Sequence, residues 1–208
     1  MKRRVSVEID LDALKRNYAK IAARVEPAGV LSVLKANAYG LGVAEYAKAL
    51  FDAGCRAFGV AEPYEALELI KILRSSRDCA EVQILSSVLP DEIEPMVKSG
   101  VILPVVDLSS ARLISAAAGK LKKIAKVHIK IDTGMGRLGI PVNGALETVI
   151  EITKLPNLDC EGIFSHCAMA YDSKDPATAR QIKAFKILLA ALKTKGLAFR
   201  KIHIAFPD

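Results

Sequence analysis

Val33-Leu-Lys-Ala-Asn-Ala-Tyr-Gly40 joins a short apolar segment to a lysine, a tyrosine and a glycine turn. The mostly aliphatic residues 30–34, which overlap this motif, are bounded by glycines, and they predict a short strand buried on both faces. A lysine that ends such a strand lies at the mouth of a core, where burial disfavours the ammonium form and frees the amine as a nucleophile. A lysine that merely extends its charge into solvent gives the same pattern, so both interpretations of Lys35 stay open at this point.

Strand-like and helix-like segments alternate outward from this motif in both directions. Strands are expected at residues 30–34, 56–61, 81–85, 101–106, 124–131, 158–164 and 200–205. Helices are expected at residues 11–25, 43–53, 63–73, 91–98, 109–118 and 175–195, and Asp10 can cap the first of them. About seven strand–helix units without repeats or a linker imply a parallel sheet covered by helices.

The residues suited to chemistry follow three different strands. Lys35, Arg137 and His166 all lie at or just beyond the C-terminal end of a predicted strand. A (β/α)8 barrel keeps its active site at that end of its strands, whereas a doubly wound sheet places it at one switch point. We therefore predict an α/β fold, a (β/α)8 barrel of the TIM type. Because a complete barrel takes roughly 250 residues, we expect this chain of 208 residues to be the front part of a longer protein, with its barrel incomplete at the C-terminus.

Composition argues against several classes of function. No apolar run approaches the ~20 residues that span a bilayer, and acidic residues stand where a signal peptide would have its apolar core, so no membrane role is expected. The net charge of +7 is spread along the chain, mostly on predicted helix faces, and we expect no nucleic-acid partner. The cysteines lack metal-ligand spacing and predict reduced thiols in a cytoplasmic protein without a metal site; they are Cys55, Cys79, Cys160 and Cys167.

Three segments resemble the alanine racemase family. Residues 35–40 resemble its pyridoxal 5′-phosphate (PLP) signature. Asp132-Thr-Gly-Met-Gly-Arg-Leu-Gly139 and Gly162-Ile-Phe-Ser-His166, followed by Cys167-Ala168, match in the same order and at similar separations. The resemblance runs from about Val5 to the end of the chain. It implies a PLP-dependent racemase that interconverts L- and D-alanine by removing and returning the α-proton, and that supplies D-alanine for bacterial peptidoglycan.

The resemblance gives each candidate residue a role. Lys35 would form the Schiff base with PLP and exchange a proton at the substrate α-carbon. Tyr39 would donate a hydrogen bond to the cofactor phosphate, and His166 would pack near the pyridine ring. Arg137 would lie near the phenolic oxygen of PLP and the substrate carboxylate, because a planar cation suits an anion. Lys130 matches a position that can be carbamylated and then orients the arginine, and strand alternation predicts that it points into the barrel.

The resemblance also implies a domain organisation. Val5, Val7 and Ile9 alternate with polar residues, so residues 1–10 are expected to form a strand that joins a C-terminal β domain. Residues 11–208 would be the PLP-binding barrel, truncated. The full-length family member is expected to be a homodimer, and this chain alone is expected to expose strand edges and to dissolve poorly or self-associate.

The sequence also departs from the family pattern. Leu41 stands where the family usually has a histidine. Beyond Asp208 the family would supply a serine, a glycine and an isoleucine for the phosphate, an arginine that faces the pyridine nitrogen, and a tyrosine base from the partner subunit. A positioned acid or base is worth roughly 10²- to 10⁴-fold, so we expect this chain by itself to be weakly active or inert.

Three alternatives remain open from the sequence. The chain can belong to a related racemase that acts on another amino acid. It can be a PLP-binding protein that carries or buffers the cofactor without turnover. It can also be a remnant that binds nothing and has merely inherited Lys35.

Overall fold

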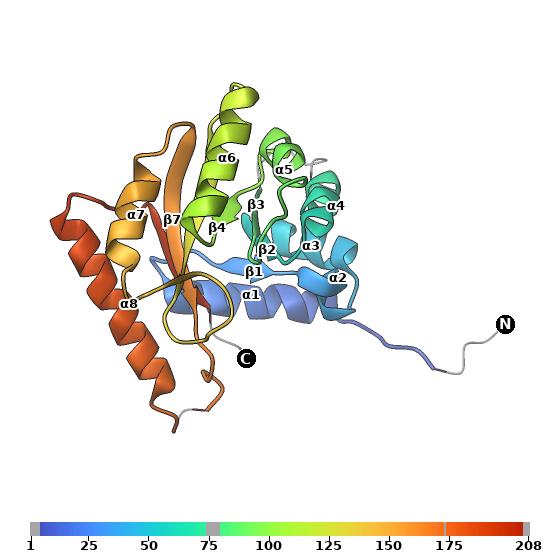
Figure 1. Cartoon of the computed structure of the whole chain (residues 1–208). Coiled ribbons are helices and arrows are strands. Elements are labelled where there is room, and N and C mark those ends of the chain that lie inside the picture. The colour runs from blue at the N-terminus through green and yellow to red at the C-terminus, as the bar shows by residue number, and fades with distance from the viewer. Residues whose placement is uncertain (1–4, 74–79, 173, 206–208) are drawn as a thin grey trace. The chain divides into compact units, whose positions relative to one another are not determined.

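The computed structural model describes residues 5–73, 80–172 and 174–205, in which helices alternate with strands (Figure 1). The chain divides into two compact units, Met1–Leu85 and Ser86–Asp208. Parts of the sequence interpretation concern residues outside the described ranges, namely Cys79 and the last three positions of the chain.

The first unit is built on a three-stranded parallel sheet. Its strands pair in chain order and are β1 (Leu31–Val33), β2 (Ala57–Val60) and β3 (Glu81–Ile84). Its helices are α1 (Leu11–Val25), α2 (Lys35–Tyr39), α3 (Val43–Asp52) and α4 (Pro63–Leu73). Helix α3 packs against α1 and α4, and α4 contacts β2 and β3. The core includes Phe58, Leu69 and Ile84, and full burial of each stabilises the unit by about 1.5–3 kcal/mol.

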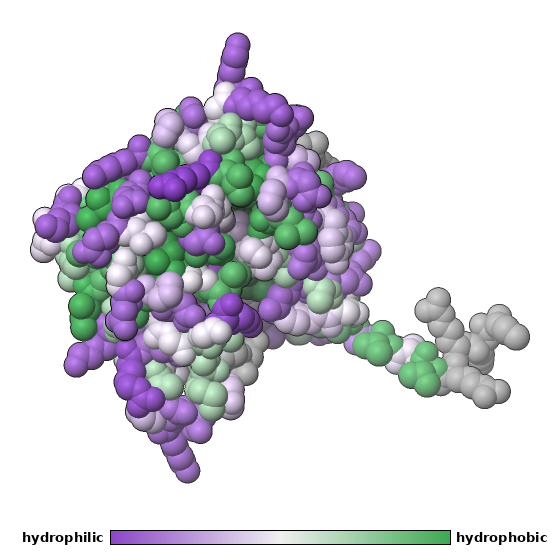
Figure 2. Space-filling view, in the orientation of Figure 1, coloured by the Kyte–Doolittle hydropathy of each residue, from purple (hydrophilic) through white to green (hydrophobic). Residues whose placement is uncertain are grey.

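The start of α1 confirms the predicted cap. Asp10 Oδ1 accepts hydrogen bonds from the backbone N–H groups of Asp12 and Ala13, each at 2.9 Å, which satisfies two donors at the helix end. Residues 5–10 before α1 form neither helix nor strand, and Val5 and Val7 are 80% and 78% exposed. Figure 2 shows hydrophobic surface on the extended N-terminal segment. A strand needs a pairing partner. The strand expected within residues 1–10 is therefore not formed at 5–10, and its pairing with another domain stays a prediction.

The second unit carries the longer strands. Strands β4 (Leu103–Val105), β5 (Ala125–Asp132), β7 (Leu158–His166) and β8 (Lys201–Ala205) pair in that order, and the short β6 (Ile140–Pro141) pairs with β5. The helices are α5 (Ile93–Ser99), α6 (Leu108–Lys120), α7 (Ala145–Thr153) and α8 (Ala177–Thr194). Helix α6 contacts β4, β5 and β7, while α7 packs against both α6 and α8, so these helices cover the sheet in chain order (Figure 1).

The sheets confirm the α/β prediction. Every strand pair in the described residues is parallel, and neighbours follow chain order in both sheets. That order is typical of barrel strands, whereas a doubly wound sheet reverses at a switch point. All seven predicted strands are present, with ends that lie within two residues of those expected. Among the described residues, no helix combines the length and apolarity needed to cross a membrane.

Two details differ from the sequence prediction. Strand β1 is half-buried along its whole length, and in the described residues it pairs with β2 alone; the expectation of burial on both faces is wrong. Elements β6 and α7 were not predicted. Helix α7 buries Ala145, Val149 and Ile152 at helical spacing. The helical spacing of these apolar residues predicts α7, but the segment is short and directly follows a loop rich in glycine.

Candidate active site

Lys35 opens the segment α2, which is a left-handed turn. The next four residues, Ala36 to Tyr39, have φ between 52° and 56°, a region that costs an L-residue about 1–2 kcal/mol. Gly40, at φ 84°, follows without that cost. The turn places Lys35 Nζ 6.0 Å from the centroid of the Tyr39 ring, so the two predicted site residues of the first motif lie together. Lys35 is half-buried, and in the described part of the chain no carboxylate pairs with its Nζ.

Side chains inside and outside the turn fix this conformation. Glu65, on the first turn of α4 and 8% exposed, accepts a hydrogen bond from the backbone N–H of Ala36 at 2.5 Å. Asn37 Oδ1 accepts a hydrogen bond from the N–H of Val43 at 2.8 Å, where α3 begins. Each contact joins the turn to a helix, so these hydrogen bonds offset the backbone strain.

Arg137 lies on the loop between β5 and β6, which Asp132 organises. The carboxylate of Asp132 accepts hydrogen bonds from the backbone N–H groups of Gly134 at 2.9 Å, Met135 at 2.8 Å and Gly136 at 2.9 Å. Burial alone raises the pKa of Asp132, but these hydrogen bonds outweigh it and lower the pKa below its ordinary value. The loop is therefore closed around an ionised carboxylate.

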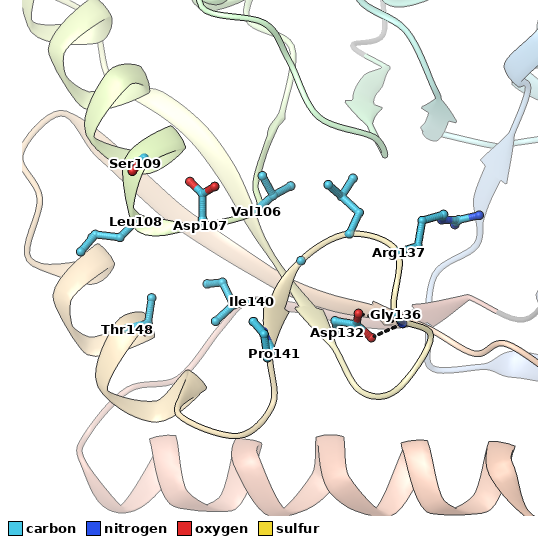
Figure 3. A pocket seen from close by; sticks show the side chains of 12 residues that line it. Val106, Asp107, Leu108, Ser109, Asp132, Gly136, Arg137, Ile140, Pro141 and Thr148 are labelled. Carbon is cyan, nitrogen blue, oxygen red and sulfur yellow. Dashed lines mark hydrogen bonds between the residues drawn. The ribbon is translucent and has the colours of Figure 1, made fainter.

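Arg137 is exposed on this loop and lines a cavity of about 730 Å³ (Figure 3). The cavity lies between the loop and the N-terminal end of α6, where Asp107 accepts a hydrogen bond from the N–H of Ser110 at 2.6 Å. In Figure 3 the guanidinium extends away from Asp107 and Thr148. It makes no ion pair or side-chain hydrogen bond with any described residue, so its charge is open to an external anion.

His166 ends β7 and is tied to the Arg137 loop through α8. Gln181 of α8 is 4% exposed and donates from Nε2 to the carbonyl oxygen of His166 at 3.2 Å and to Thr133 Oγ1 at 3.3 Å. Its Oε1 accepts a hydrogen bond from the N–H of Ala168 at 3.0 Å. One buried amide therefore joins the ends of β5 and β7 to a single helix.

Lys130 is buried on β5, where it pairs with Phe164 of β7, and its predicted direction into a barrel stays a prediction. It is 5% exposed, and its Nζ lies 5.2 Å from the centroid of the Phe164 ring. This burial fits a lysine that carries a modification or a close partner.

A buried polar cluster lies on β5, β7 and β8. His128 Nδ1 is 3.1 Å from His203 Nε2, and His128 Nε2 is 3.3 Å from Glu161 Oε1. Lys201 Nζ donates to Glu161 at 3.1 Å. Burial, with the positive charges of its neighbours, lowers the pKa of His203 to about 3, so this imidazole is neutral at physiological pH. Among the described residues, no set of three or more suitable side chains is arranged to hold a metal ion.

Each unit thus contains some of the predicted site residues. Lys35 and Tyr39 belong to the first unit, and Arg137, His166 and Lys130 belong to the second. Sequence analysis missed Glu65 and Gln181, which organise these residues. Their contacts reach across 29 and up to 48 positions, and no local pattern marks them.

Comparison with known proteins covers nearly the whole chain. A family model described as the N-terminal domain of alanine racemase matches residues 9–206. The alanine racemase of Methanococcus maripaludis is 38% identical over 192 residues, which are 91% of this chain and 50% of that protein. A solved alanine racemase of Clostridium difficile, in complex with cycloserine, superposes with a TM-score of 0.85 and 29% identity over 93% of this chain and 52% of that one. An alanine racemase of Bartonella henselae with covalently bound pyridoxal phosphate gives a TM-score of 0.82 and 31% identity over 95% and 55%.

These structural neighbours confirm the predicted α/β fold of the TIM type. The chain spans about half the length of the relatives it matches. Because the family model covers residues 9–206, the chain belongs to the alanine racemase N-terminal domain family.

Proposed function

We propose that this chain is the PLP-binding part of an alanine racemase, and that the whole protein interconverts L- and D-alanine. The observation that carries this proposal is the left-handed turn after β1, which presents the amine of Lys35 beside Tyr39 with no carboxylate partner in the described residues. The Bartonella henselae relative carries covalently bound pyridoxal phosphate, which supports the same cofactor here.

The residues present fit PLP. The half-buried amine of Lys35 is accessible to an aldehyde, and the exposed phenol of Tyr39 can donate to a phosphate. The exposed guanidinium of Arg137 suits an anion such as the phenolic oxygen of PLP or the substrate carboxylate. When bound, PLP supplies a conjugated ring that takes up the negative charge left by the departing α-proton.

In the proposed reaction, Lys35 Nζ removes or returns the proton at the substrate α-carbon on one face. Arg137 binds the substrate carboxylate and fixes the α-carbon relative to that amine, while His166 packs near the pyridine ring. Lys130, once carbamylated, would orient Arg137.

The remaining assignments concern the whole protein. We propose that the opposite base is a tyrosine from the C-terminal domain of a partner subunit, so that the active form is a homodimer. We also propose a cytoplasmic location and a role in supplying D-alanine for peptidoglycan. The free thiols of Cys55, Cys160 and Cys167 are typical of a reducing compartment.

Reductive trapping tests the proposal. The purified chain is incubated with PLP, reduced with borohydride and digested, and the modified lysines are located by mass spectrometry. We expect one dominant adduct on Lys35 that is absent from Lys35→Ala. Lys48→Ala, which removes an exposed lysine of α3, serves as the matched control and should label normally. Adducts spread evenly over surface lysines would refute the proposed site.

A further inference from the structure

We propose that Glu65 is a positioning residue that holds the Lys35 turn in its reactive conformation. The inference rests on the proposed function of Lys35, and it concerns a side chain of a different strand–helix unit, 29 positions along the chain.

The two carboxylate oxygens of Glu65 serve different elements. Oε2 accepts hydrogen bonds from the N–H groups of Ala61 and Glu62, each at 2.9 Å, and so closes the start of α4. Oε1 accepts the N–H of Ala36 at 2.5 Å. A glutamate that only capped its own helix would need a single oxygen for this task. The second oxygen is committed to the residue that follows Lys35.

The backbone that begins at Ala36 needs the hydrogen bond to Glu65. Ala36 is the first of four consecutive residues in the left-handed region, and three of them carry ordinary side chains that avoid it. The far end of the turn is fixed by Asn37 Oδ1, which accepts the N–H of Val43. Glu65 therefore fixes the near end, directly beside the lysine, and its 8% exposure limits the competition of water for its own oxygens.

Loss of the Ala36 contact should release the near end of the turn. The Lys35 amine would then sample several positions relative to Tyr39 instead of one. A bound aldehyde would meet the amine less often in the productive geometry, so adduct formation at Lys35 should slow while other lysines are unaffected.

The variant Glu65→Asp tests this with Glu68→Asp as its matched control. Glu68 lies on the same helix but is exposed. The shorter aspartate keeps a negative charge at the start of α4 but cannot serve both α4 and Ala36. Two rates are measured for each variant at a temperature equally far below its thermal midpoint. The first is the rate of hydrogen exchange at the Ala36 amide, and the second is the rate of borohydride-trapped labelling at Lys35 relative to Lys48.

We expect Glu65→Asp to speed exchange at Ala36 by at least about tenfold, and to slow labelling of Lys35 by a similar factor at constant labelling of Lys48. Unchanged exchange and labelling in Glu65→Asp would overturn the proposal. If Glu65→Asp does not fold, Glu65→Gln replaces it. This variant has the same shape but one acceptor oxygen, so either Ala36 or α4 loses its partner.

The outcome also separates this proposal from the proposed function. Wild-type protein that is never labelled at Lys35 contradicts the PLP site, while Ala36 exchange still reports on the Glu65 contact. Wild-type protein labelled at Lys35, with an equally labelled Glu65→Asp, contradicts the positioning role alone.

Discussion

The turn that carries Lys35 and the loop that carries Arg137 each follow a parallel strand, and each is organised by a carboxylate. In the loop, Asp132 binds the N–H groups of residues two to four positions ahead of it. In the turn, the carboxylate comes from Glu65 on α4, 29 positions after Ala36. The hydrogen bonds to Asp132 therefore come from the loop's own sequence, whereas the turn depends on the packing of α4.

This difference has a physical consequence for stability. A local carboxylate loses little chain entropy when it closes its loop, so the Arg137 loop should tolerate changes elsewhere in the unit. The Lys35 turn should respond to any change that moves α4. Variants of the two regions should therefore distinguish a loop held by hydrogen bonds to a nearby residue from a turn held by a residue of a distant helix.

The largest effect is expected for Asp132→Ala. Removal of an acceptor shared by three backbone N–H groups should lower the free energy of unfolding by about 2–3 kcal/mol. Asp132→Asn should cost less, because Oδ1 alone accepts all three hydrogen bonds. Denaturant titration measures both variants, and equal losses for Ala and Asn would contradict a role that depends on this oxygen.

Next in size is a pair of glycine substitutions, one in each region. Gly139→Ala places a Cβ 3.0 Å from Asp132 N and Lys130 O at φ 123°, so we expect a loss of about 2–3 kcal/mol. Gly40→Ala, at φ 84° with nothing within 4 Å, should cost only about 1 kcal/mol. Thermal unfolding compares the two. A larger loss for Gly40→Ala would mean that the Lys35 turn is the tighter region.

A smaller effect is expected for Asn37→Ala. The variant loses the hydrogen bond to Val43 N–H and the residue type that best tolerates the left-handed region, for about 1 kcal/mol in total. Asn37→Asp keeps an acceptor and should fall between wild type and Ala. Denaturant midpoints decide the order, and an Asp variant as unstable as Ala would contradict the capping role.

The smallest effect is a pH dependence confined to the Arg137 loop. Because the folded state lowers the pKa of Asp132 below the ordinary 3.8, the ionised carboxylate stabilises the fold fully above about pH 4. That contribution is lost as the pH falls through the lowered value. The stability difference between wild type and Asp132→Asn should therefore shrink in acid. A difference that grows on acidification would have the wrong sign for this account.

The contrast between the two regions also explains what could be predicted from sequence. The strand ends and the cap at Asp10 depend on neighbours in the chain, so the sequence pattern was sufficient to predict them. The glycine spacing around Arg137 likewise marks a loop. Glu65 and Gln181 could not be found this way, because on their own helices they resemble ordinary polar residues. Their roles arise only when distant strands and helices meet.

The half-buried strand β1 gives a second example of what sequence could not predict. Its aliphatic sequence predicts burial, but burial also depends on the elements that pack beside and over the strand, and in the described residues β1 pairs with β2 alone. The ends of a strand can be predicted from its own residues, whereas its burial depends on the elements that pack against it.

The central claim is that the Lys35 turn presents the amine that binds PLP. A crystal structure of the chain after incubation with PLP and borohydride reduction tests it most directly. We predict the reduced cofactor on Lys35 Nζ, with Tyr39 at its phosphate. A cofactor attached to another lysine, or attached to Lys35 with Tyr39 turned away from its phosphate, would contradict the account.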